Sequence, residues 1–247
     1  MNLKSPREIA IMKESGHIVF QALELARGLA KPGISTLEIN NKIEEFIIAQ
    51  NAIPSFKGYN DFPAAICASI NDEVVHGIPS KRILVEGDIL SVDVGAKYNG
   101  YHADAARTFP VGNVNPEYLR LIEVTEKCFW NGVEKIKPGN RISDISIAIE
   151  KTAKDAGFYV IKELIGHGVG QNLHEKPDVY NYYTGRRGER LVPGLVIAIE
   201  PMINLSTEDI EMLQDGSTIV TCDGGPSAHY ENTVAVTENG YEVLTNQ

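Results

Sequence analysis

The sequence predicts a mixed α/β fold built from two structurally related halves. Stretches with apolar residues at helical spacing alternate with shorter stretches in which apolar and polar residues alternate, as in strands. The order of helix, Lys-Pro-Gly turn, helix and strands occurs twice along the chain, and such internal similarity indicates related structural units. We therefore expect one domain over residues 1–247, with halves of roughly 1–112 and 113–247.

Length and composition exclude several classes of protein. The 247 residues suffice for a sizeable core, and the net charge of −10 with scattered lysines and arginines argues against a nucleic-acid partner. The N-terminus lacks the apolar core of a signal peptide, and no apolar stretch reaches the roughly 18 residues of a membrane span. We expect a cytoplasmic monomer. Three cysteines, widely spaced and odd in number, argue against a disulfide framework or a zinc knuckle, so any metal would be bound through oxygen and nitrogen: Cys67, Cys128 and Cys222.

Two helices open the chain. The first is predicted over residues 5–29, because Ser5 and the proline after it suit a helix start and apolar residues then recur at helical spacing. A turn at residues 31–33 precedes a second helix over residues 35–49. Residues 54–80 are rich in glycine, proline and aromatic residues, and we expect them to form short strands that line a pocket.

The segment 87–106 predicts a β-hairpin whose turn is Asn99-Gly100, since both residues tolerate the positive φ of a type I′ turn. With these two as the loop, Gly95 faces Asp104, so Asp93 and Asp104 lie diagonally on one face. Two carboxylates this close need a shared proton, a cation or exposure to water. For an aspartate pair alone, exposure is the more common explanation. The other face of the first strand is apolar and predicts a core: Leu90, Val92 and Val94.

The second half repeats the same order of elements. A helix is predicted from Asn115-Pro116 to Val133, followed by the second Lys-Pro-Gly turn and a helix from Ile142 to Ala156 that Gly157 ends. A strand over residues 192–200 then corresponds to residues 85–93 of the first half.

This correspondence gives two further acidic residues. Glu200 takes the place of Asp93, and it points away from the two isoleucines that alternate with it. Glu231 is the candidate counterpart of Asp104, just before final strands at 233–236 and 241–244 that a second Asn-Gly pair joins.

A histidine completes a possible set of metal ligands. His167 lies in a glycine-rich loop, where the main chain can approach a ligand closely, although a single histidine there is more often structural. Four carboxylates gathered in a cleft would be unstable without cations. The joint set can hold two divalent ions about 3.5 to 4 Å apart. Its members are Asp93, Asp104, His167, Glu200 and Glu231.

The chain resembles type I methionine aminopeptidases of the bacterial type, which lack an N-terminal extension. The resemblance covers nearly the whole chain and implies the pita-bread fold, in which an antiparallel curved sheet covered by helices forms two pseudo-symmetric halves around a dinuclear metal site. It rests on separated motifs: Asn71 to Pro79, Val92-Asp93, Ala103-Asp104, Gly166-His167-Gly168-Val169-Gly170 with His174 and Pro177, Ile199-Glu200-Pro201 and Glu231-Asn232-Thr233.

The resemblance implies a role for each ligand. Asp104 and Glu231 would bridge the two ions, Asp93 would bind one, and His167 and Glu200 would bind the other. A hydroxide bridging the metals would attack the first peptide bond after the N-terminal methionine of nascent proteins, with Glu200 as proton shuttle. The ion could be Co, Mn, Fe(II) or Zn, because these ligands accept each of them. The ribosome is a further partner to consider.

The substrate residues follow from the same resemblance. His174 would contact the scissile carbonyl and His76 the substrate amide, and both would stabilise the tetrahedral intermediate. Phe56 and Leu164 differ from residues found at their positions in relatives, which leaves the size of the methionine pocket open. Three residues match positions that line this pocket, although core packing alone also explains them: Tyr59, Phe62 and Cys67.

The remaining histidines do not belong to the predicted metal site. His102 faces Lys97 in the predicted hairpin, and we expect it to point away from the metal site. His17 lies in the first helix, remote from every motif, and we expect both to be structural. His229 shares a strand face with Glu231, which leaves an accessory role open.

Three alternatives agree less well with the sequence. A prolidase or aminopeptidase P usually carries an additional N-terminal domain, for which the chain before Asp93 is too short. A type II enzyme inserts a helical subdomain between the histidine and the first glutamate, and Glu200 lies only 33 positions after His167. A binding module on the same fold would have lost ligands, whereas all five are present.

Overall fold

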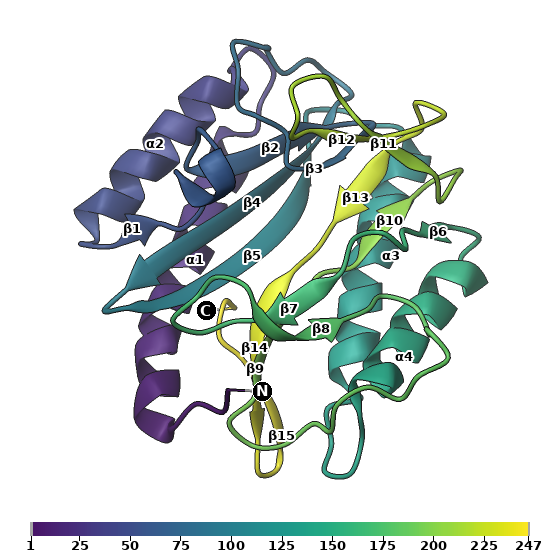
Figure 1. The fold of residues 1–247 in the computed structure, drawn as a ribbon. Coiled ribbons are helices and arrows are strands. Elements are labelled where there is room, and N and C mark those ends of the chain that lie inside the picture. Colours follow the sequence, from purple (N-terminus) through teal and green to yellow (C-terminus); the bar gives the residue numbers. More distant parts are fainter. Residues whose placement is uncertain (1, 247) are drawn as a thin grey trace.

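Two pairs of helices flank the strands in the computed structural model, which describes residues 2–246 (Figure 1). Helices α1 and α2 lie on one side and α3 and α4 on the other, and the strands run between them. The first half contains α1 (Pro6–Leu29), α2 (Thr36–Ala49), β1 (Ile53–Pro54), a 3-10 turn (Tyr59–Asp61), β2 (Ile66–Ile70), β3 (Glu73–Val75), β4 (Ile89–Tyr98) and β5 (Tyr101–Pro110). The second half contains α3 (Pro116–Val133), α4 (Ile142–Asp155), β6 (Tyr159–Val160), β7 (Gly166–Gly168), β8 (Glu175–Val179), β9 (Val196–Ile199), β10 (Met202–Asn204), β11 (Ile210–Met212), β12 (Ile219–Thr221), β13 (Ser227–His229), β14 (Asn232–Thr237) and β15 (Gly240–Val243).

Both helices of the first half begin where the sequence predicts. The Ser5 side chain accepts a hydrogen bond from the main-chain N–H of Glu8, and the Glu8 carboxylate accepts one from the Ser5 N–H. Ser35 and Glu38 form the same reciprocal pair at the start of α2. These bonds satisfy N–H groups that a helix start otherwise leaves without a partner, and so they fix both starts.

The central hairpin has the predicted register. Asn99 and Gly100 both adopt positive φ, of 46° and 89°, and form the turn between β4 and β5. Gly95 pairs with Asp104 and Asp93 pairs with Ala106, so the two aspartates are diagonal neighbours as expected. The hairpin therefore presents two carboxylates on one face from local sequence alone.

The strands meet along the middle of the molecule. In the first half β4 lies between β2 and β5, and β1 extends the same sheet. The second half has a five-stranded sheet in the order β15-β14-β9-β7-β8. The free edge of β5 contacts the second half, because the main chains of Ala106 and Glu231 exchange hydrogen bonds of 3.0 and 3.4 Å. This junction joins the two halves beside the predicted ligands.

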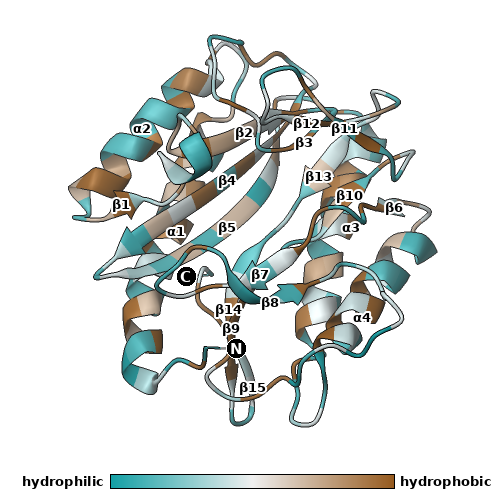
Figure 2. Ribbon diagram, in the orientation of Figure 1, coloured by the Kyte–Doolittle hydropathy of each residue, from teal (hydrophilic) through white to brown (hydrophobic). Residues whose placement is uncertain are grey.

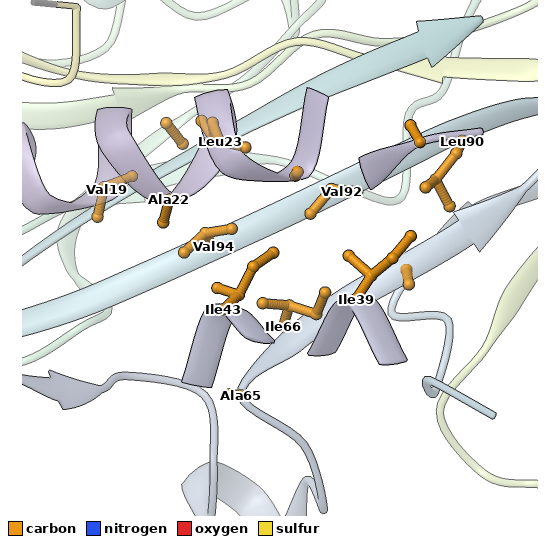
Figure 3. Packing of buried hydrophobic residues seen from close by; sticks show 14 of the residues in the cluster. Val19, Ala22, Leu23, Ile39, Ile43, Ala65, Ile66, Leu90, Val92 and Val94 are labelled. Atoms are coloured by element: carbon orange, nitrogen blue, oxygen red, sulfur yellow. The ribbon is translucent and has the colours of Figure 1, made fainter. Parts of the chain in front are cut away.

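Each half has its own hydrophobic cluster. The first contains α1, α2 and the apolar face of β4, where Leu23, Ile43 and Val94 pack together (Figure 3). The second packs α3 and α4 against β9, β10 and β14. The hydropathy colours alternate along each helix, which shows one apolar face on each (Figure 2). The boundaries of the two halves nevertheless stay a prediction.

The structure corrects the extent of one predicted strand. The stretch predicted over residues 192–200 is extended only in β9, because Gly194 adopts a positive φ of 90° and forms a turn before the strand. Glu200 consequently lies one residue past the end of β9. Among residues 2–246, no helix is long and apolar enough to cross a membrane.

Candidate metal centre

The five predicted ligands line a single cavity of about 260 Å³. Asp93 comes from β4, Asp104 from β5 and His167 from β7. Glu200 directly follows β9, and Glu231 lies in the short link between β13 and β14. Residues that are far apart in the sequence therefore meet where the two halves join.

Distances define the centre of this group. The His167 Nε2 atom lies 3.5 Å from Asp104 Oδ2 and 3.5 Å from Glu200 Oε1. One ligand atom each from Asp104, His167 and Glu231 lie within 4.8 Å of one another. Nitrogen and carboxylate oxygen at such separations can share one divalent cation.

A hydrogen bond of His167 identifies which of its two ring nitrogens carries the proton. Its Nδ1 lies 2.9 Å from the carbonyl oxygen of Gly168. A carbonyl oxygen only accepts, so Nδ1 carries the proton and Nε2 keeps its lone pair. That lone pair points toward two carboxylates, an arrangement that is repulsive unless a cation or a proton lies between them.

Contacts across the two halves orient Asp104. Its main-chain N–H donates to the hydroxyl oxygen of Thr233 at 3.0 Å. The same hydroxyl lies 2.9 Å from Asp104 Oδ1. A residue of β14 thus holds a carboxylate of β5, which links the position of this ligand to the packing of the halves.

The site is unfavourable for charge without a cation. Burial raises the pKa of Asp93, Glu200 and Glu231 well above their usual range, and the neighbouring carboxylates raise each further. Burial also raises the pKa of Asp104, to about 6, and lowers that of His167 to about 4. Burial therefore shifts each of the five groups toward its uncharged form.

The residues fit a metal ion. Asp93 Oδ1 is buried, and it has no hydrogen-bond partner within the part of the chain that the structure describes. A buried oxygen without a partner, a histidine lone pair and crowded carboxylates are together what a divalent cation would satisfy. The donors are oxygen and nitrogen, as the cysteine pattern led us to expect.

The same cavity also has an apolar part and includes the predicted substrate residues. His76 and His174 line the same cavity as the five ligands. The hydroxyl of Tyr59 lies 2.7 Å from His174 Nδ1, and the His174 ring meets the His167 ring edge-on at 4.1 Å between centroids. An apolar cluster forms the wall: Phe56, Cys67 and Leu173, with Tyr59 and Phe62 packed against it.

His76 has a strained main chain. Its φ is 58°, a conformation that residues other than glycine seldom adopt. The hydroxyl of Ser217 donates to its carbonyl oxygen at 3.0 Å, and Gly77 follows at a position where a Cβ would meet the carbonyl oxygen of Ala68 at 2.4 Å. Strain of this kind persists only where the surroundings hold it, and it is frequent at functional sites.

The remaining histidines separate into three cases. His102 lies on the same face of β5 as Asp104, two residues before it, so the prediction that it points to the opposite face is wrong; its Nδ1 lies 2.8 Å from the Ser55 hydroxyl, and it does not line the cavity. His17 is exposed on α1. His229, whose role the sequence left open, is buried with its Nε2 3.8 Å from Glu200 Oε2 and 4.0 Å from Glu231 Oε2.

Sequence reasoning missed several residues at this site. Leu173 and Met212 line the cavity from loop and hairpin positions that only tertiary packing defines. Arg107 and Thr233 contact the ligand segments from β5 and β14. Arg107 did leave a signal, since it is a charged residue in a strand that is otherwise small or apolar around it.

A buried cluster of carboxylates and imidazole at the base of a cavity, on this α/β fold, defines a metal-dependent hydrolase. The model of metallopeptidase family M24 matches residues 10–238. Methionine aminopeptidase 1 of Bacillus subtilis (strain 168) is 50% identical over 242 residues, which cover 98% of each chain. The crystal structure of methionine aminopeptidase from Thermotoga maritima superposes with a TM-score of 0.98 at 41% identity and covers 100% of both chains. The chain belongs to metallopeptidase family M24, and within that family to the methionine aminopeptidases.

A more distant neighbour shows that the fold alone does not choose the substrate. Prolidase from Pyrococcus furiosus has a TM-score of 0.82 at 26% identity, and the match covers 99% of this chain but 65% of that chain. The predicted pita-bread fold is confirmed by both structural neighbours. The higher identity and complete coverage favour the methionine aminopeptidases over the prolidases.

Proposed function

We propose that the protein removes the initiator methionine from the N-terminus of nascent proteins as a metal-dependent aminopeptidase. The observation that carries the proposal is the lone pair of His167 Nε2 facing buried carboxylates beside an apolar wall. A polar centre for hydrolysis and an apolar site for a thioether side chain are thus adjacent. The relatives reported above support the substrate class.

Two divalent ions would be held by the five ligands. Asp104 and Glu231 would contact both ions, Asp93 would bind one, and His167 and Glu200 would bind the other. When bound, such a pair supplies an activated water and polarises the carbonyl, as in known two-metal aminopeptidases. Co, Mn, Fe(II) and Zn all suit ligands of this type.

The side chains around the ligands would handle protons and the substrate carbonyl. Glu200 would accept a proton from the attacking water and return it to the leaving amine. His174 would donate from Nε2 to the oxygen that becomes negative, with the hydroxyl of Tyr59 holding its Nδ1. His76 would contact the substrate amide from its strained position.

The apolar wall would bind the methionine side chain. Tyr59, Phe62 and Cys67 would contact it, together with Phe56 and Leu173 from the same cluster. Aromatic edges suit a polarisable sulfur atom, and excluding water from the wall strengthens the polar contacts beside it. Ile or Leu would fill the wall less well because their branches are closer to the main chain.

Location and partners belong to the same proposal. We expect the enzyme to act as a monomer in the cytoplasm on nascent chains, with the ribosome as a candidate partner. The acidic net charge gives no support to direct binding of nucleic acid.

A peptide assay tests the proposed function. Purified protein is freed of metal, loaded in turn with Co²⁺, Mn²⁺, Fe²⁺ or Zn²⁺, and given a Met-Gly-x peptide and an x-Pro peptide in parallel. We expect release of free methionine from the first peptide only, and none from metal-free protein. Release from neither peptide with any of the four metals would contradict the proposal, and cleavage of the x-Pro peptide would favour a prolidase.

A further inference from the structure

Arg107 is a buried cation between the two halves of the molecule. It lies on β5, is 8% exposed, and makes three hydrogen bonds. Its Nη1 donates to the carbonyl oxygens of Ala106 at 2.8 Å and Glu231 at 2.6 Å. Its Nη2 donates to Asn232 Oδ1 at 2.7 Å. A guanidinium from the first half therefore holds main-chain and side-chain oxygens of the second.

An aromatic ring completes the surroundings of this side chain. The Arg107 Cζ atom lies 4.1 Å from the ring centroid of Tyr230, a favourable distance for a cation over an aromatic face. None of the three hydrogen bonds goes to a carboxylate. Burying the guanidinium costs solvation free energy. The contacts of Arg107 to residues 230–232 therefore have to be favourable enough to offset that cost.

The contacts fix the spacing between two predicted ligands. Asp104 lies three positions before Arg107 on β5, and Glu231 is the residue whose carbonyl the guanidinium holds. The main chains of Ala106 and Glu231 exchange hydrogen bonds beside it. The fork of hydrogen bonds from Arg107 and this main-chain pair therefore act together with the contacts of Thr233 to Asp104 in setting the distance between Asp104 and Glu231.

We propose that Arg107 is a positioning residue for the metal centre, which holds Glu231 at the place where its carboxylate can share an ion with Asp104. Arg107 acts through the main chain of Glu231 and through the side chain of Asn232, because it donates to the carbonyl oxygen of the first and to the amide oxygen of the second. The inference rests on the proposed function, since that proposal makes Asp104 and Glu231 ligands. A guanidinium suits this task because its planar fork directs several donors at fixed angles.

Titration calorimetry of metal-free protein with Mn²⁺ tests this role without an activity readout. We expect Arg107→Met to weaken Mn²⁺ binding by about 10- to 100-fold, as is typical when a partner that orients a ligand is removed. Arg107→Lys keeps the buried charge but loses the fork, and we expect it to remain weakened at least about 10-fold.

The chain offers a matched control. Arg120 is exposed, donates to the carbonyl oxygen of Ala156 and lies with its Cζ 4.7 Å from the Phe158 ring centroid, so it combines a carbonyl hydrogen bond with an aromatic contact away from the junction. We expect Arg120→Met to bind Mn²⁺ like the unchanged protein. Thermal unfolding of each metal-free variant shows whether it is folded.

Each outcome decides between defined possibilities. If the unchanged protein binds no Mn²⁺, the proposed metal centre fails, whatever Arg107 does. If the unchanged protein binds and Arg107→Met binds equally well, only the role of Arg107 is wrong. Full recovery by Arg107→Lys would also overturn it, because charge alone would then suffice. Should Arg107→Met fail to fold, the affinity of Arg107→Lys decides: unchanged affinity contradicts the role and weakened affinity supports it.

Discussion

The two halves supply their predicted ligands in different ways. The first half places Asp93 and Asp104 on neighbouring strands of one hairpin, and the register of that hairpin follows from its two-residue turn. The second half supplies His167, Glu200 and Glu231 from β7, from the residue after β9 and from the link between β13 and β14. The main-chain positions of the first pair are therefore fixed by local structure, whereas the positions of the second set depend on the packing of several short strands.

This difference assigns distinct tasks to the halves. A hairpin with strands of ten residues each is a rigid platform, since every residue of β4 pairs with one of β5. Contacts across the junction hold one ligand from each half, because Arg107 of the first half holds the main chain of Glu231 and Thr233 of the second half holds the carboxylate of Asp104. The first half thus supplies two ligands on one hairpin, and the second half supplies three ligands whose positions depend on how its short strands pack.

Removing the central carboxylate of the platform should have the largest effect. We expect Asp104→Ala to lose both ions and to reduce methionine release by more than about 1000-fold, because this carboxylate would contact both metals. Metal content after dialysis, measured by mass spectrometry, checks the first part and the peptide assay the second. Asp155→Ala, which removes an exposed acid on α4, is the control and should change neither. Full metal content in Asp104→Ala would refute the role of the hairpin as platform.

A substrate histidine from the second half should behave differently. We expect His174→Ala to keep its metal but to lower kcat by about 100- to 1000-fold, as for the loss of one donor to a developing oxyanion. Metal content after dialysis and the peptide assay check the two parts of this prediction. Equal loss of metal in His174→Ala and Asp104→Ala would show that the distinction between ligand and substrate residue is wrong.

The comparison of the halves also explains what the sequence could predict. The helix starts at Ser5 and Ser35 and the hairpin register are local, so turn and capping chemistry predicted them correctly. Glu200 and Glu231 were predicted from the internal repeat, and the structure brings both into the cavity with Asp93. Their roles as ligands stay a prediction.

Other features depend on contacts that the sequence does not encode locally. The cavity wall includes Leu173 and Met212, which lie far apart in the chain and are ordinary apolar residues by type. The strand predicted over residues 192–200 was too long because a turn at Gly194 takes its first residues. Arg107 and Thr233 were not predicted, since their partners belong to the other half.

Removing the hydroxyl of Thr233, which contacts Asp104 across the junction, should have an intermediate effect. Thr233→Val removes the group that lies 2.9 Å from Asp104 Oδ1, and we expect it to destabilise the metal-free protein by about 1 to 3 kcal/mol and to weaken Mn²⁺ binding. Thr125→Val is the control, because that buried hydroxyl donates to the Leu121 carbonyl within one turn of α3. Denaturant unfolding and calorimetry measure the two effects. Unaltered Mn²⁺ affinity in Thr233→Val would show that Asp104 does not need the second half.

The smallest effect should come from the contact between Tyr59 of the first half and His174 of the second. Tyr59→Phe keeps the ring that lines the apolar wall but removes the hydroxyl 2.7 Å from His174 Nδ1. A neutral hydrogen bond contributes about 1 kcal/mol, so we expect kcat to fall about fivefold while KM stays unchanged.

Truncating the same ring separates the two roles of Tyr59. Tyr59→Leu loses both the hydroxyl and part of the wall, and we expect KM for Met-Gly-x to rise in addition to the fall in kcat. Steady-state kinetics of both variants, with metal content verified, measures the split. If Tyr59→Phe raised KM and left kcat unchanged, the hydroxyl would act on the substrate and not through His174. Tyr59 and His174 would then each contact the substrate separately, and the hydrogen bond between them would not contribute to catalysis.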